Sequence, residues 1–101
     1  MKFIFPSTCF DDFFSAIPPI YAQQKKHKLN LLKRHGLHAC LGTAFLRQAT
    51  PSEAPAEYVL LLQDPGIETI FIFLQWKVIN DEEVIIFLGI IPQRYSSMSK
   101  S

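Results

Sequence analysis

The chain has 101 residues, of which 49% are hydrophobic, and a formal net charge of +1. This length suits one domain with a real hydrophobic core, here expected to span residues 1–101 with a frayed tail at 95–101. The apolar runs are far shorter than the ~20 residues of a membrane-spanning helix, and no Cys/His grouping has zinc spacing, so we expect neither a membrane nor a metal among the partners. The apolar start Met1–Phe5 is too short for a secretory signal, which makes the cytoplasm the expected location.

The N-terminal part predicts a short strand followed by a helix. Lys2–Phe5 is apolar and β-prone, and Pro6 ends it. Phe10, Phe13, Phe14 and Ile17 then fall at i, i+3, i+4 and i+7, which predicts an amphipathic helix whose aromatic face packs on a sheet.

A second, basic helix is predicted from about Pro19 to His35. Pro18 and Pro19 stop the first helix, and proline fits the first turn of the next one. Tyr21, Leu29 and Leu32 should form its buried side. Gly36 is a good residue to end it, because glycine accepts a positive φ.

The middle of the chain gives weaker signals. Leu37–Ala49 has apolar residues at helical spacing, but Gly42 and Thr43 weaken a helix there, so a loop and a short helix both stay open. The two prolines of Thr50–Pro55 predict a loop. Cys9 and Cys40 fit best as small buried hydrophobic residues, although they could pair.

The C-terminal half predicts an antiparallel sheet of three strands, Tyr58–Leu62, Ile70–Trp76 and Val84–Ile91. Turn residues separate these runs, and the best hairpin joins Ile70–Val78 to Val84–Ile91. Because the runs are almost continuously apolar, both faces of the sheet should be largely covered. The expected fold is α+β, in the order β-α-α-β-β-β, with two N-terminal helices packed on an antiparallel sheet.

Charge is segregated along the chain. No acidic residue lies between Phe13 and Ser52, whereas acids predominate between Glu53 and Gln93. Such segregation can direct one face at a polyanion, and a solvated helix face is the alternative. The basic span holds Lys25, Lys26, Lys28, Lys33, Arg34 and Arg47.

Several stretches also resemble a known family. They are Phe13–Pro18 followed by the basic helix, Leu31–Leu37, Glu57–Leu61, and Ile70–Phe73 followed by Asn80–Gly89. Over roughly residues 2–94 the chain resembles the RelE/ParE toxin superfamily, and within it the HigB and phage-derived toxin-like branch.

The resemblance implies the toxin of a type II toxin–antitoxin system, a ribosome-associated mRNA endoribonuclease that uses no metal or other cofactor. Its partners would be mRNA on the ribosome and a cognate antitoxin, expected to be of the helix-turn-helix type. Cations around the phosphate and a group that moves protons would then be needed. Lys25, Lys28, Lys33, Arg34, His38 and Arg47 are the expected RNA-binding residues.

The chain departs from the family at positions expected to be catalytic. Leu61 and Leu88 stand where the family has arginine and histidine, and Glu68 or a neighbour stands where an arginine is common. Arg94 and Tyr95 are then the candidate catalytic residues, Arg94 for the phosphate and Tyr95 to stack a base or carry a proton, unless both belong to the frayed tail.

Two alternative functions stay open. One is a catalytically degenerate protein of the same fold that acts by binding another protein. The other is a small α+β interaction module whose apolar sheet forms a homodimer, as its nine phenylalanines would permit. His27 and His35 are interpreted as surface histidines. A surface histidine is also the alternative interpretation of His38, beside RNA binding.

Overall fold

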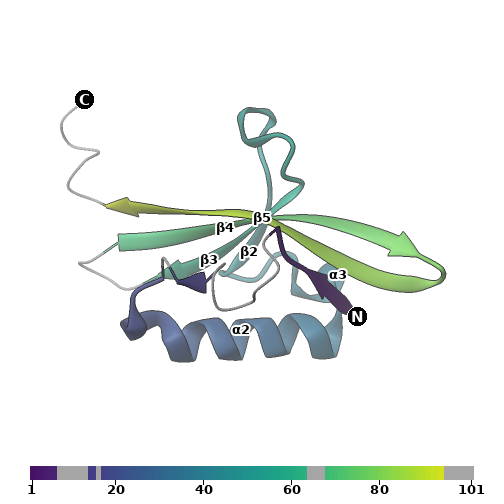
Figure 1. The fold of residues 1–101 in the computed structure, drawn as a ribbon, viewed down its shortest axis with the longest axis horizontal. Helices are drawn as coiled ribbons and strands as arrows, with labels where there is room; N and C mark the ends of the chain where they lie inside the picture. The colour runs from purple at the N-terminus through teal and green to yellow at the C-terminus, as the bar shows by residue number, and fades with distance from the viewer. Residues whose placement is uncertain (7–13, 16, 64–67, 95–101) are drawn as a thin grey trace.

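The computed structural model describes residues 1–6, 14–15, 17–63 and 68–94 (Figure 1). Two long elements, the helix α2 and the β4–β5 hairpin, run along its greatest dimension. In chain order the elements are β1 (Lys2–Ile4), a 3-10 turn (Pro19–Tyr21), α2 (Ala22–His35), α3 (Leu37–Cys40), β2 (Leu46–Gln48), a second 3-10 turn (Pro51–Glu53), β3 (Tyr58–Gln63), β4 (Glu68–Ile79) and β5 (Glu82–Arg94).

The strands form one sheet in the order β1-β5-β4-β3-β2. The predicted meander of β3, β4 and β5 is confirmed, because both of its pairings are antiparallel. The expectation of a wholly antiparallel sheet is wrong, since β1 pairs with β5 in parallel, Phe3 opposite Ile85. The sheet is therefore mixed.

The predicted β4–β5 hairpin closes through Asn80 and Asp81. Both residues have positive φ, 54° and 63°, as a two-residue turn that matches strand twist requires. Asn and Asp are the non-glycine residues that tolerate this region best. Between Phe73 and Leu74 of β4 the register with β5 shifts, so that Gly89 and then Phe87 lie opposite these two residues.

The helix α2 packs against one face of the sheet, as predicted for Pro19–His35. Tyr21, Leu29 and Leu32 are buried beneath it in the core. The Tyr21 hydroxyl also donates a hydrogen bond to the Glu68 carbonyl, which ties the start of the helix to the start of β4. Gly36 ends the helix at φ 87°, and its N–H donates to the Leu32 carbonyl.

The other predicted helix falls mostly outside the described residues. Of its apolar stripe, Phe14 is buried, and its ring packs edge-on against Phe5 and Phe87. Ile17 packs against the same core. The core role of this stripe is thus confirmed for Phe14 and Ile17. Among the described residues, one long helix, α2, lies on the sheet, where two were expected.

The ambiguous segment Leu37–Ala49 divides into a short helix and a strand. Leu37 and Cys40 face the core from α3, and Leu46 faces it from β2. Cys40 has a free, buried thiol, and burial raises its pKa. Sequence reasoning missed β2, which pairs with β3 through three residues.

The two faces of the sheet are covered unequally (Figure 1). The helices lie on one face, and the connection between β2 and β3 rises from the other. We call this second face the open face. The expectation that both faces are covered holds at Val59 and Val84, which are buried there, but Ile4 and Ile91 of the same face are exposed.

Candidate nucleic-acid interface

The outward side of α2 forms a groove with β1. Its volume is about 430 Å³, and one turn of the helix after another contributes to its wall. The floor is apolar and the rim is cationic. We call this the basic groove; its lining is Phe3, Ala22, Lys25, Lys26, Leu29, Asn30 and Lys33.

Aromatic rings hold two of the rim lysines in place. The Lys33 ammonium lies 5.3 Å from the centre of the Phe3 ring, and the Lys25 ammonium lies 4.7 Å from the centre of the Phe14 ring. A ring face attracts a cation through its quadrupole but carries no net charge, so the ring itself does not neutralise the ammonium. The Lys33 ammonium over Phe3 therefore keeps its attraction for anions.

Three cations at this surface have no acidic partner among the residues that the structure describes. The α2 sequence contains no Asp or Glu, and in the described part of the chain Lys26, Lys33 and Arg34 have no carboxylate partner. Arg34 adjoins the basic groove, because it lines a shallow hollow together with Asn30 and Lys33. Three of the predicted RNA-binding residues, Lys25, Lys33 and Arg34, are thus brought together.

Lys28 is turned away from this surface. Its ammonium donates to the Leu61 carbonyl at 2.9 Å and to the Gln24 side-chain oxygen at 3.2 Å, over the ring of Phe45. Gln24 in turn donates to the Gln63 carbonyl at 2.6 Å and accepts from the Gln63 N–H at 3.0 Å. Burial lowers the pKa of Lys28. The side chains of Lys28 and Gln24 together cover the part of the β3 edge that β2 leaves unpaired.

Arg47 lies on the open face, on the other side of the sheet. Its guanidinium binds both carboxylate oxygens of Glu53, at 3.0 and 2.9 Å. The hydrogen bonds from Arg47, with a further one from the Thr50 N–H, lower the pKa of Glu53 from 4.5 to about 2. The pairing also raises the pKa of Arg47. Its charge is thus already neutralised within the chain.

His38 is exposed on α3, apart from the basic groove. Its ring packs edge-on against Trp76, with 4.6 Å between the centres. The Trp76 Nε1 is buried and has no hydrogen-bond partner among the described residues, so the imidazole ring covers part of an unsatisfied indole. This contact gives His38 a packing role.

One of the two candidate catalytic residues, Arg94, is the last residue of β5. The backbone of Arg94 pairs with Glu68 at the start of β4, and Tyr95 lies outside the described residues. Because Tyr21 holds the start of α2 to Glu68, this strand end is at the same end of the molecule as Lys25. The arrangement brings Arg94 nearer to the start of α2 than to its end.

Of the residues that line the basic groove, sequence reasoning assigned only Lys25 and Lys33 to RNA binding. Lys26, Asn30 and Lys33 follow one another at i, i+4 and i+7, and this spacing was a signal that could have added Lys26 and Asn30. Phe3 gave no local signal, because only the parallel pairing of β1 brings it beside α2.

The basic groove and the adjoining Arg34 have the chemistry of an anion-binding surface. In the described part of the chain no group of three or more His, Cys, Asp or Glu side chains is placed to hold a metal ion, and no helix there has the length and apolar character needed to cross a bilayer. Comparison with known proteins gives no match among protein-family models, curated proteins or solved structures.

Proposed function

We propose that the protein binds RNA through the basic groove and acts as the toxin of a type II toxin–antitoxin system in the cytoplasm. The observation that supports binding is the gathering of Lys25, Lys26, Lys33 and Arg34 on a helix without acidic residues. Phosphates are the anions that such a row of cations fits best, because each contact releases a counterion from the nucleic acid.

The shape of the surface favours a strand that lies along the helix. Lys26, Asn30 and Lys33 recur on successive turns, which are ~5.4 Å apart in an α-helix. The cations can therefore meet successive phosphates, while the amide of Asn30 can both donate and accept hydrogen bonds. The apolar floor leaves room beside them for a sugar or a base edge.

Cleavage of mRNA on the ribosome is the finer part of the proposal, and it comes from the family resemblance. Arg94 would stabilise the charge that develops on the phosphate, and Tyr95 would stack a base or carry a proton. A cognate antitoxin of the helix-turn-helix type would hold the toxin inactive.

A second candidate is a catalytically degenerate protein of the same fold that acts by binding another protein. Leu61 and Leu88 both contribute to the open face, where they present hydrocarbon at positions that the family fills with arginine and histidine. Arg47 of the same face is already paired with Glu53. Loss of such groups typically costs a factor of ~10²–10⁴ each.

Binding is tested by one substitution and its matched control. Lys33→Gln and Lys77→Gln each remove one exposed positive charge, but only Lys33 lines the basic groove. We expect Lys33→Gln to weaken binding of a fluorescent single-stranded RNA several-fold in anisotropy titrations, and to reduce the salt slope by ~0.7. An equal loss of RNA affinity in the two variants would mean that only net charge matters, and would remove the basic groove from the proposal.

Cleavage has a separate readout. Induced expression of the wild-type chain should arrest growth and cut messages, and Tyr95→Phe or Arg94→Gln should restore whole transcripts without changing RNA affinity. Normal growth with intact transcripts, together with recovery of a small helix-turn-helix protein, would instead favour the second candidate. A small helix-turn-helix protein recovered with the wild-type chain is the expected antitoxin.

A further inference from the structure

The open face carries a second surface that RNA binding does not use. Its apolar side chains come from four of the strands, and they are only partly buried. Among them Ile91 is the most exposed, at 53%. Apart from the buried Val59 and Val84, the apolar residues that form this surface are Ile4, Leu61, Phe71, Phe73, Ile86, Leu88 and Ile91.

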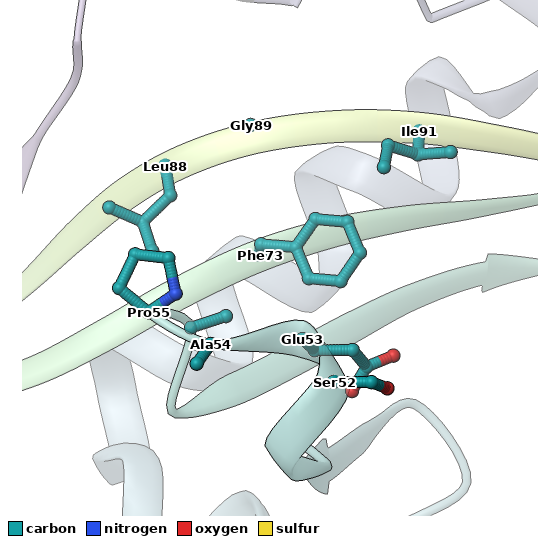
Figure 2. Close-up of a pocket in the computed structure, with 9 residues that line it drawn as sticks. Ser52, Glu53, Ala54, Pro55, Phe73, Leu88, Gly89 and Ile91 are labelled. Atoms are coloured by element: carbon teal, nitrogen blue, oxygen red, sulfur yellow. The ribbon is translucent and has the colours of Figure 1, made fainter.

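A groove of about 370 Å³ crosses this face (Figure 2). One wall is the segment Ser52–Ala56, which rises from the sheet, and the other is formed by β4 and β5. Figure 2 shows Pro55 beside Leu88, with the Phe73 ring on the floor and Ile91 farther along β5. Nearly all of this lining is hydrocarbon.

Gly89 forms part of the groove and lies opposite Phe73, where the register of β4 and β5 shifts. Its φ is not in the left-handed region, and a Cβ added there would meet no atom within 4 Å. Glycine in the interior of a strand costs stability, and it commonly marks a bulge or a place where another backbone or a ligand approaches closely. The space above Gly89 is open to an occupant from outside the chain.

Two ion pairs neutralise the charges around the centre of the open face. Arg47 binds Glu53 at 2.9 Å, and Lys77 lies 3.8 Å from Glu57. The centre of the face is thus electrically neutral, whereas the basic groove on α2 would repel a copy of itself. An identical neutral face is a partner that this surface meets without electrostatic cost.

The size of the face also suits self-association. At ~3.4 Å per residue and ~4.8 Å between strands, β4 and β5 form a ribbon roughly 40 Å long and 10 Å wide. The flanking strands and the Ser52–Ala56 segment extend it towards the ~800 Å² per partner of a standard interface. Two sheets can pack in this way about 10 Å apart.

We infer that the open face binds the open face of a second copy of this chain, so that the protein is a dimer with sheet packed on sheet. The space above Gly89 admits a side chain of the partner copy, and the Ser52–Ala56 segments border the contact. The basic grooves then lie on the outer sides of the dimer, because α2 covers the opposite face of each sheet.

Sedimentation equilibrium across micromolar to submillimolar concentrations tests this inference. The wild-type chain should show a monomer–dimer equilibrium that does not weaken with salt, since burial of apolar surface drives it. Ile91→Glu should raise the dimer dissociation constant at least about tenfold. Ile20→Glu is the matched control, because Ile20 is equally exposed, at 57%, but precedes α2 and lies off the open face.

Gly89→Val keeps the test valid if a charged variant folds poorly. The new Cβ meets no atom within 4 Å, and valine favours a strand, so thermal stability of the monomer should hold or rise while dimerisation is lost. A wild-type chain that stays monomeric throughout would overturn the inference and leave the face to a different protein. Retention of the dimer in both Ile91→Glu and Gly89→Val would overturn it as well.

Discussion

The contact between Gln24 and the free edge of β3 gives a prediction that is local enough to measure at one amide. The Gln24 side chain makes two hydrogen bonds to the backbone of Gln63, in the manner of a neighbouring strand. Gln24→Leu removes both bonds and keeps a side chain of similar size. The Gln63 N–H then has only water as a partner.

The cost of Gln24→Leu follows from the net free energy that each hydrogen bond contributes to stability. Each contributes about 0.5–1.5 kcal/mol, and exposed bonds belong to the lower half of that range, so the local cost is about 1–2 kcal/mol. This cost corresponds to an increase of roughly 5–30-fold in the population of the open edge. Exchange of the Gln63 amide with deuterium should accelerate by the same factor.

Hydrogen exchange followed by NMR provides the assay and its internal reference. The Leu61 amide donates to the Phe45 carbonyl at 2.8 Å and should exchange at its wild-type rate. Gln23→Leu makes the same substitution one residue earlier, where the side chain is exposed, and should leave the Gln63 amide unchanged. Unaltered exchange of Gln63 in Gln24→Leu would refute the view that α2 caps this edge.

Three further substitutions test the fold. Glu53→Gln should lower the free energy of unfolding by about 1 kcal/mol at neutral pH, a value reduced by the partial exposure of Arg47. Since the pKa of Glu53 falls from 4.5 to about 2 on folding, this contribution is complete above pH 4.5 and is lost as the pH falls towards 2, where urea titrations of the two proteins should coincide. Gly36→Ala should cost about 1–2 kcal/mol, because φ is 87° and the new Cβ would lie 3.3 Å from a Glu83 oxygen; a melting temperature equal to that of the wild type would contradict the strain. Phe87→Ala should cost about 3–5 kcal/mol in thermal denaturation, since the ring is buried among the rings of Phe3, Phe5 and Phe14; a loss below 1 kcal/mol would show that the cluster is loosely packed.

Elements whose signals are local could be predicted from the sequence. The turn at Asn80 and Asp81 and the helix end at Gly36 depend on the backbone preferences of the residues themselves, and both were found in place. The buried stripe of Tyr21, Leu29 and Leu32 follows from helical spacing alone.

Features that depend on distant partners could not be predicted. The strand β2 is three residues long, and its apolar neighbours Leu37, Leu41 and Phe45 have helical spacing. The parallel position of β1 has no local signal at all. In the candidate site, the sequence predicted a basic helix, but Lys28 became an edge cap and Arg47 an ion-pair partner only through contacts made by folding.

The parallel pairing of β1 with β5 has a consequence for synthesis of the chain. Lys2–Ile4 leave the ribosome some eighty residues before their partners Val84–Ile86. Until then Phe3 and Phe5 lack the ring of Phe87, and the nascent chain exposes aromatic side chains that the folded chain packs together. Completion of the core therefore waits for translation of β5, and chaperones that recognise exposed aromatic segments have their opportunity during that interval.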